Sequence, residues 1–335
     1  MKLKIVVDDK IPFIEGRLEP VAEVVYAAPA DIMPELVKDA DALLVRTRTK
    51  CDENLLGTSN VKLVATATIG MDHFDREWLG KAGITAVNAA GCNAPGVAQY
   101  VWSSLLRNGF DSSRHTLGVV GFGHIGSIVA DWGRKMGVKI LVCDPPRKDM
   151  GMEDEEYLPM EKLLRECDAV TLHTPLTHDG KYPTFHLISE KELKMMKPGA
   201  ILVNASRGPV VDNTTWRDYL KNSDARGIID VWEGEPALDK ELLQLAEIAT
   251  PHIAGYSLEG KERATRMVLE AVEKKFGVTV DKSGLEGAYQ APEMVNPEKI
   301  VASYDPYVDT SLLRNASDEL ERLRDTYCLR REPQL

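Results

Sequence analysis

The chain has 335 residues, of which 44 % are hydrophobic and 28 % are charged, so it can form two soluble domains with sizeable cores. Its 41 basic and 52 acidic residues give a net charge of −11, which disfavours a nucleic-acid partner because phosphate backbones would be repelled. No apolar stretch approaches the ~20 residues that a membrane span requires, so no membrane association is expected.

Short apolar runs separated by amphipathic stretches open the chain. Runs of this length, rich in β-branched residues, are typical of parallel strands buried on both faces. They predict strands at residues 3–7, 23–27, 41–46, 62–67 and 84–89.

The first run is too short for a signal peptide, and the five cysteines lack C-x-x-C spacing. We therefore expect a cytoplasmic protein with free thiols, and no His or Cys spacing that suits a metal.

Cations alternate with hydroxyl groups directly after the third predicted strand. Arg46, Arg48 and Lys50 are interleaved with Thr47 and Thr49. In an extended segment this alternation would give one basic face and one hydroxylated face, which suits an anionic sugar acid. The alternative is an exposed charged loop. Arg46 is therefore a candidate substrate-binding residue.

A helix is predicted over residues 93–110, where it links two series of strands. Asn93 is placed to cap its N-terminus, and Val97, Val101 and Leu105 share one face. The second series of strands follows it, at residues 117–121, 138–143, 169–173, 200–205, 227–231 and 247–250. Such alternation of strands and helices indicates a doubly wound α/β sheet.

The sequence LGVVGFGHIG contains the pattern G-x-G-x-x-G between a predicted strand and a predicted helix. Gly121 would permit a tight turn, Gly123 a close approach of the backbone to a pyrophosphate, and Gly126 close packing of the helix on the strand. Asp144 lies 18 residues beyond Gly126, where a carboxylate can bind ribose hydroxyls and repel a 2′-phosphate. The pattern predicts NAD as the cofactor, although Arg147 leaves NADP open. A purely structural turn is the alternative.

Arg207, Glu235 and His252 each follow one of the last three predicted strands. Because ligands gather at the carboxyl ends of parallel strands, we expect these side chains to share a site. Arg207 can bind a carboxylate with its planar fork, His252 can accept a hydroxyl proton, and Glu235 can orient the imidazole. Together they predict hydride transfer between a 2-hydroxy acid and the cofactor. Taken singly, each could instead be structural: a carbonyl cap, a solvated turn and a core histidine.

A second long helix is predicted over residues 257–276, with a serine cap at its start. From about Val280 the pattern is irregular until a final amphipathic segment, on which Leu313, Leu320 and Tyr327 would share a helical face. That face must be covered, either by the chain's own domain or by a second subunit.

Six segments, in this order along the chain, resemble the D-isomer-specific 2-hydroxyacid dehydrogenase family. They are VRTRTK (45–50), GVVGFGHIG (118–126), HTPLT (173–177), LVNASRGPVVD (202–212), DVWEGEP (230–236) and PHIAG (251–255). The resemblance implies an α/β fold with two doubly wound parallel-sheet domains. Residues 1–92 and 256–279 would form a flavodoxin-like substrate domain, residues 93–255 a Rossmann NAD domain, and residues 280–335 a small C-terminal dimerisation region of a homodimer.

The resemblance also implies roles for individual residues. Arg207, Glu235 and His252 match the catalytic set, and Thr47, Thr68 and Tyr256 join Arg46 as substrate-binding positions. The cofactor-binding positions are Gly121, Gly123, His124, Ile125, Gly126, Asp144, Thr174, Ala205, Ser206, Asp230 and Gly255.

Further segments narrow the resemblance, among them GCNAPGVAQYV (91–101), CDPPR (143–147) and ELERLRDTYCLRRE (319–332). They resemble the branch of the family that oxidises 4-phospho-D-erythronate to (R)-3-hydroxy-2-oxo-4-phosphooxybutanoate in the biosynthesis of pyridoxal 5′-phosphate. The expected partner is thus a small phosphorylated 2-hydroxy acid. Two alternatives stay open: another D-2-hydroxyacid dehydrogenase, such as one acting on 3-phosphoglycerate, and a non-catalytic, NADH-sensing protein similar to a corepressor.

Overall fold

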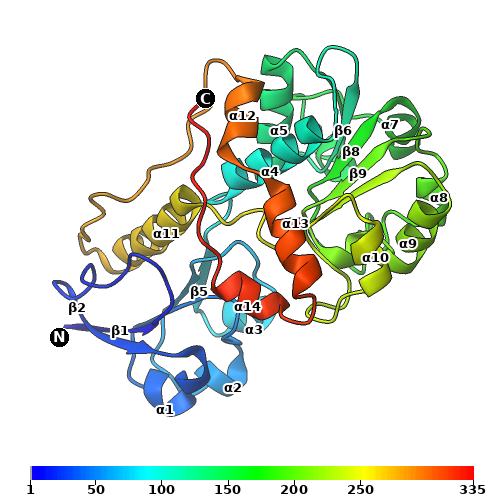
Figure 1. Ribbon diagram of the computed structural model, residues 1–335. Coiled ribbons are helices and arrows are strands. Elements are labelled where there is room, and N and C mark those ends of the chain that lie inside the picture. Colours follow the sequence, from blue (N-terminus) through cyan, green and yellow to red (C-terminus); the bar gives the residue numbers. More distant parts are fainter. Residues whose placement is uncertain (1) are drawn as a thin grey trace. The chain divides into compact units, whose positions relative to one another are not determined.

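The computed structural model describes residues 2–335, which divide into two compact units (Figure 1). Unit 1 takes the chain up to Asn93 together with Ser257–Gln290, and unit 2 consists of Ala94–Tyr256 and Ala291–Leu335. Each unit is interrupted in sequence by part of the other. The predicted C-terminal region, 280–335, is divided between the two units, and its role in dimerisation stays a prediction.

Unit 1 contains a five-stranded sheet in the order β2-β1-β3-β4-β5, with every pair of neighbours parallel. This order is the flavodoxin-like one that was expected. The strands are β1 (Leu3–Asp8), β2 (Ala22–Ala27), β3 (Ala42–Val45), β4 (Leu63–Thr66) and β5 (Thr85–Asn88). All five predicted strands are confirmed, with bounds that differ by no more than about two residues.

Two hydrophobic cores cover the two faces of this sheet. On one face, Val268, Leu269 and Val272 of the long helix α11 pack against strand residues such as Leu44. On the other, Val6 and neighbouring residues pack against short helices. The helices of unit 1 are α1 (Pro34–Val37), α2 (Glu53–Leu56), α3 (Arg76–Lys81) and α11 (Leu258–Phe276), with a 3₁₀ turn η1 (Pro29–Asp31). The predicted serine cap is present, since the side chain of Ser257 accepts the amide of Gly260 at 3.1 Å.

Unit 2 contains a six-stranded parallel sheet in the order β11-β10-β9-β8-β6-β7. Its strands are β6 (Thr116–Val120), β7 (Lys139–Cys143), β8 (Ala169–Leu172), β9 (Ile201–Asn204), β10 (Arg226–Ile229) and β11 (Ile248–Ala249). The chain begins at β6, adds β7 on one side and then β8 on the other. The edge of the sheet between β6 and β8 is therefore a topological switch point, where doubly wound folds bind their ligands.

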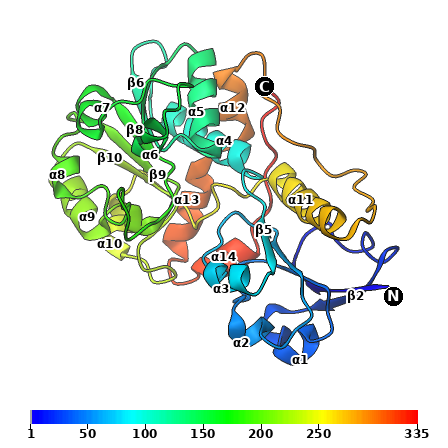
Figure 2. The ribbon, with the colours of Figure 1, turned by 180° about the vertical axis from the view of Figure 1, so that it is seen from behind.

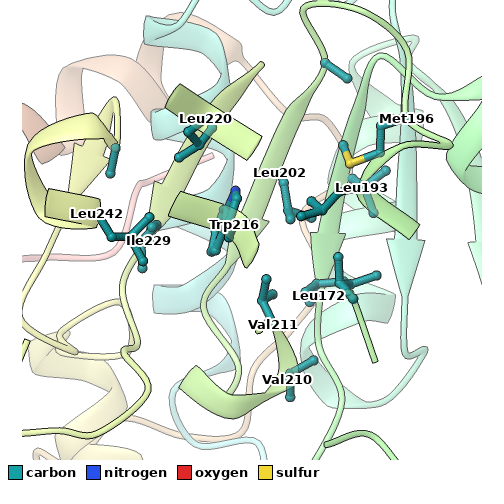
Figure 3. Close-up of a cluster of buried hydrophobic side chains, with 14 of the residues drawn as sticks. Leu172, Leu193, Met196, Leu202, Val210, Val211, Trp216, Leu220, Ile229 and Leu242 are labelled. Atoms are coloured by element: carbon teal, nitrogen blue, oxygen red, sulfur yellow. The ribbon is translucent and has the colours of Figure 1, made fainter. Parts of the chain in front are cut away.

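Helices cover both faces of the second sheet. Figures 1 and 2 show α4, α5 and α12 on one side of it and α8 and α9 on the other. Trp216, Leu193 and Leu242 contribute to a cluster of buried apolar side chains, part of which Figure 3 shows. The helices are α4 (Ala94–Arg107), α5 (His124–Lys135), α6 (Pro145–Asp149), α7 (Met160–Glu166), α8 (Glu190–Leu193), α9 (Asn213–Lys221), α10 (Lys240–Leu245), α12 (Pro297–Ser303), α13 (Pro306–Asn315) and α14 (Leu320–Asp325), with a 3₁₀ turn η2 (Gly208–Val210).

Two local predictions were wrong. Asn93 does not cap α4, because its Oδ1 has no hydrogen-bond partner within the described chain. The amphipathic tail is not one helix: α13 ends at Asn315, and α14 begins only at Leu320. The break lets Leu313 and Leu320 both enter the core of unit 2, where each is no more than 1 % exposed. The tail therefore covers its own unit, which was the simpler of the two expectations.

Candidate active site

The glycine-rich loop lies at the switch point of the second sheet, between β6 and α5. Gly121 has φ = +88°, and a Cβ on it would come within 2.7 Å of the His173 carbonyl oxygen. A Cβ on Gly126 would lie 2.0 Å from the Gly121 carbonyl oxygen, whereas one on Gly123 would meet nothing within 4 Å. The loop therefore needs glycine for its turn and for helix packing, and it leaves open space at Gly123 for a ligand.

Asp144 directly follows β7 beside this loop and also shapes it. Its Oδ2 accepts the amide of Phe122 at 2.7 Å, and its Oδ1 accepts the amide of Arg147 at 3.0 Å. The guanidinium of Arg147 is bound elsewhere, to Asp154 at 2.5 Å and to the hydroxyl of Tyr157 at 2.9 Å. A carboxylate thus faces the loop while the nearby cation is neutralised, which favours ribose hydroxyls over a 2′-phosphate.

Two buried polar atoms beside the loop have no protein partner within the described chain: Nδ1 of His173 and Oγ1 of Thr174. Unpaired buried groups are rare, and these two fit contact with a polar ligand. His124 and Ile125 form the first turn of α5, whose exposed amides suit an anion. Ala205 and Ser206 follow β9, and the Ser206 hydroxyl donates to Asn204 Oδ1 at 2.9 Å. The residues at this edge therefore fit a dinucleotide.

The three predicted catalytic residues follow three adjacent strands. Arg207 follows β9, Glu235 follows β10 and His252 follows β11, and β10 pairs with both of the others. Gly208 allows the backbone after Arg207 to pass very close to the next strand end, since a Cβ on it would lie 2.1 Å from the Trp232 carbonyl. The side chain of Arg207 donates to the carbonyl of Ser206 at 2.8 Å.

Glu235 and His252 form a hydrogen-bonded pair. Oε2 of Glu235 lies 2.9 Å from Nδ1 of the ring, and Oε1 accepts the Trp232 amide at 2.8 Å. With Nδ1 protonated toward Glu235, Nε2 carries the lone pair that can accept a proton. The His252 side chain is 32 % exposed and that of Glu235 21 %, so both side chains are partly buried and the ring keeps accessible surface.

The electrostatics of this pair favour an ionised carboxylate. Burial opposes ionisation of Glu235, but the hydrogen bond and charge of His252, with the Trp232 amide, lower the pKa of Glu235 below its ordinary value. An ionised Glu235 stabilises the ring when it takes up a proton. The pair therefore has the arrangement of a general base, His252, and a carboxylate that orients it, Glu235.

The loop that carries His252 has an unusual backbone. His252 has φ = +58°, a left-handed conformation that costs a non-glycine residue about 1 kcal/mol or more. The buried side chain of Asp230 holds this loop in place. It is 1 % exposed and accepts the amides of Ile253 at 2.8 Å and Ala254 at 2.9 Å. Asp230 was predicted to bind the cofactor, and in the structure its carboxylate supports the loop that ends at Gly255 and Tyr256.

The predicted substrate residues of unit 1 do not form an alternating surface. β3 ends at Val45, and residues 47–49 form a turn and bend, so the expectation of an extended segment was wrong. Arg46 pairs with the buried Asp8 at 3.1 Å, Thr47 is exposed, and Thr49 is buried. Thr68 is half-buried, with its hydroxyl 2.6 Å from that of Thr66.

Tyr256, the remaining predicted substrate residue, lies in unit 2. Its ring packs edge-on against Tyr327 with the centroids 5.9 Å apart. Arg324 of α14 interacts electrostatically with both Tyr256 and Glu235. The C-terminal segment therefore lies next to the candidate catalytic pair within the same unit.

Sequence reasoning missed two supporting residues. Asn204 ends β9; its Oδ1 accepts the amide of Ser206 at 3.1 Å and its Nδ2 donates to the Arg207 carbonyl at 2.9 Å. A polar residue ending a buried strand was a usable signal for it. Arg330 contacts the loop after His252 through backbone carbonyls, and the sequence carries no signal for such partners.

One cluster in the described part of the chain has donor atoms close enough for a metal: His186, Asp212 and Glu233. These groups bind one another and their surroundings instead. Nε2 of His186 lies 2.8 Å from Glu233, and Asp212 caps α9 through the amide of Thr215. The expectation of no metal site stays a prediction.

Comparison with known proteins identifies the class to which this fold and site belong. Residues 94–254 match the family described as "D-isomer specific 2-hydroxyacid dehydrogenase, NAD binding domain". The chain belongs to this family of NAD-dependent dehydrogenases.

Two relatives and one solved structure show which members of the family the chain resembles. The chain is 43 % identical to an erythronate-4-phosphate dehydrogenase of Bacteroides fragilis, over 98 % of this chain and 97 % of that protein. It is 41 % identical to the same enzyme of Escherichia coli O157:H7, over 98 % and 92 %. An NAD⁺-bound 3-phosphoglycerate dehydrogenase of Entamoeba histolytica is similar in structure, with a TM-score of 0.68, 26 % identity, and coverage of 86 % of this chain and 99 % of that one. No helix of the described residues is long and apolar enough to cross a membrane.

Proposed function

We propose that this protein oxidises 4-phospho-D-erythronate with NAD⁺ to (R)-3-hydroxy-2-oxo-4-phosphooxybutanoate, a step in the biosynthesis of pyridoxal 5′-phosphate. The observation that carries the proposal is the 2.9 Å pair of Glu235 and His252 at the sheet edge that holds the glycine loop. The similarity to erythronate-4-phosphate dehydrogenases over 98 % of the chain supports the choice of substrate.

The protein's side chains have distinct tasks in this reaction. Arg207 binds the substrate carboxylate, for which its planar fork is suited, and so aligns C2. Nε2 of His252 takes the proton of the C2 hydroxyl, while Glu235 holds the ring and stabilises its protonated form. NAD⁺, held along the glycine loop, would supply the acceptor for the hydride that leaves C2. In the reverse direction, His252 returns the proton to the carbonyl oxygen.

The cofactor is proposed to lie along the glycine loop, with its ribose at Asp144 and polar contacts at Thr174, Ala205 and Ser206. The open space at Gly123 and the unpaired hydroxyl of Thr174 support this placement. The proposed substrate contacts are Arg46, Thr47, Thr68 and Tyr256.

The test is an absorbance assay of NAD⁺ reduction with 4-phospho-D-erythronate, 3-phosphoglycerate and D-lactate as parallel substrates. We expect kcat/KM to be highest with 4-phospho-D-erythronate. A preference for 3-phosphoglycerate would replace the proposed substrate and keep the chemistry. NADH binding without turnover of any of the three would instead favour the non-catalytic alternative.

We further propose a homodimer that uses the C-terminal region and works in the cytoplasm. Val308 and Leu312 of α13 support an interface, because they are 59 % and 51 % exposed and lie four residues apart on one helical face. The five free cysteines, four of them buried, support a reducing compartment.

A further inference from the structure

We propose that Arg330 is a positioning residue for the reaction: its guanidinium fixes the loop from His252 to Tyr256 and thereby aims the imidazole of His252. This role rests on the proposed function of His252 as the proton acceptor.

The guanidinium lies against the carbonyl side of the loop. Arg330 is 8 % exposed, and its Nη1 donates to the carbonyl oxygens of Ile253 at 2.9 Å and Tyr256 at 3.4 Å. Its Nη2 donates to the carbonyl oxygen of Ala254. One cation thus binds three carbonyl groups within the four residues that follow His252.

The remaining donors anchor the same cation to the body of unit 2. Nη2 also donates to the Gly96 carbonyl in the first turn of α4 at 3.0 Å, and Nε donates to Oε1 of Gln99 at 2.9 Å. The guanidinium carbon lies 4.5 Å from the ring centroid of Tyr304, a cation–π contact. The position of the guanidinium is therefore set by α4 and Tyr304, and the position of the loop is set by the guanidinium.

The amide side of the loop is held by a group of opposite charge. Asp230 accepts the amides of Ile253 and Ala254, and its backbone carbonyl accepts the amide of His252 at 2.8 Å. The same two residues, Ile253 and Ala254, are therefore bound by a carboxylate through their N–H groups and by Arg330 through their C=O groups. A residue with φ = +58° keeps that conformation only where its surroundings impose it, and this double contact does so.

Other charged and titratable groups pack around the two ends of this arrangement. Asp309 accepts the hydroxyls of Tyr304 and Tyr327. The hydroxyl of Thr250 lies 2.9 Å from the Tyr100 hydroxyl oxygen and 2.6 Å from Oδ1 of Asp230, which accepts from it. Glu235 and Arg324 face the His252 end. Of the charged groups named here, Arg330 is the one that donates to the carbonyls of Ile253, Ala254 and Tyr256.

The test uses three variants of the full-length protein. Arg330→Ala removes the guanidinium, and Arg330→Lys keeps the charge but not the planar fork. Arg314→Gln is the matched control, since Arg314 also joins the C-terminal segment to backbone carbonyls. Its partners are Leu243 and Ala246, with Nη2 2.5 Å from the Ala246 oxygen, and not residues 252–256. Thermal unfolding and NADH binding are measured for all three.

We expect Arg330→Ala to lower kcat by about 10²-fold, the usual effect of a small misplacement of a reacting group. Arg330→Lys should lower it by about 10-fold, and millimolar guanidinium should partly restore Arg330→Ala. The acid limb of the pH profile of kcat/KM should also move, because a displaced ring changes its contact with Glu235. Arg314→Gln should leave the acid limb unchanged, whatever stability it loses. If Arg330→Ala and Arg314→Gln have equal effects on stability and on kcat, and neither moves the acid limb, the proposal is overturned.

A readout that does not depend on the substrate separates this proposal from the proposed function. The chain has seven histidines, so ¹⁵N-histidine labelling gives a simple spectrum in which His252→Gln assigns the signal of interest. Arg330→Lys should change the Nδ1 shift and the titration midpoint of His252, and Arg314→Gln should not. If Arg330→Ala does not fold, this comparison decides. An unchanged His252 signal contradicts the positioning role even if 4-phospho-D-erythronate is a substrate, and a changed one supports it even if the substrate is another hydroxy acid.

Discussion

His252 is the residue on which the proposed chemistry depends most directly. His252→Ala should lower turnover by ~10²–10⁴-fold, the usual contribution of a positioned acid or base. NADH binding, measured by fluorescence, should persist because the glycine loop is untouched. His186→Ala is the control, since His186 also pairs with a glutamate, Glu233, at 2.8 Å but is not one of the three proposed catalytic residues. Equal losses in both variants would argue against a role for His252 in proton transfer.

Glu235 links the site to the stability of the fold. Its pKa is below the ordinary value of 4.5, so its ionised form stabilises the folded state above that pH and the contribution is lost as the pH falls through the folded-state pKa. Glu235→Gln should therefore lower the free energy of unfolding by about 1–3 kcal/mol at neutral pH. Urea unfolding at a series of pH values should show the two proteins converging in acid. A constant difference down to acid pH would contradict an ionised pair.

Asp144 is expected to select the cofactor. Asp144→Ser should reduce the preference for NAD⁺ over NADP⁺ by about 10-fold, because the charge that repels a 2′-phosphate is gone. Asp144→Asn serves as a partner variant that keeps an acceptor for the amide of Phe122 while losing the charge. Steady-state kinetics with both cofactors provide the measurement, and an unchanged ratio in both variants would remove Asp144 from the ribose site.

At the level of secondary-structure elements, the glycine loop separates packing from binding. Gly126→Ala should destabilise the protein by about 1–3 kcal/mol, because its Cβ would lie 2.0 Å from the Gly121 carbonyl oxygen. Gly123→Ala should leave the melting temperature unchanged, because nothing in the protein lies within 4 Å of that Cβ. The same variant should weaken NADH binding, because the methyl group would occupy the space proposed for the pyrophosphate. Calorimetry and NADH titration test the pair. Unaltered NADH binding in Gly123→Ala would place the pyrophosphate elsewhere.

The strands were predictable from sequence because each is a short run rich in apolar residues. The central strands β3, β4, β8 and β9 are buried throughout. The ends of these strands, and hence Arg207, Glu235 and His252, followed from the same pattern. The turn after β3 was not predictable, because alternation of cations and threonines fits a strand and a turn equally. The contribution of Arg330 was hidden for a different reason: its partners are backbone carbonyls, which every residue has.

At the scale of the whole molecule, the proposed homodimer gives a prediction of assembly. Light scattering of the native protein should give twice the chain mass of 37.1 kDa. The double variant Val308→Asp and Leu312→Asp should give a mass near that of one chain, because charges on an apolar face oppose its burial. Met294→Asp, at another highly exposed apolar residue of unit 2, is the control and should remain dimeric. A native monomer, or a double variant that remains dimeric, would contradict an interface at α13.

The interrupted order of the two units has a consequence for how the protein is made. Ribosomes release the chain from its N-terminus onward, so both segments of unit 1 have emerged before residues 291–335 of unit 2 appear. Until then the apolar sites filled by Leu313 and Leu320 are vacant and the carbonyls beside His252 lack their cation. A nascent chain can therefore complete unit 1 before unit 2, and the contacts that we propose to position His252 can form only after the last segment of unit 2 has emerged.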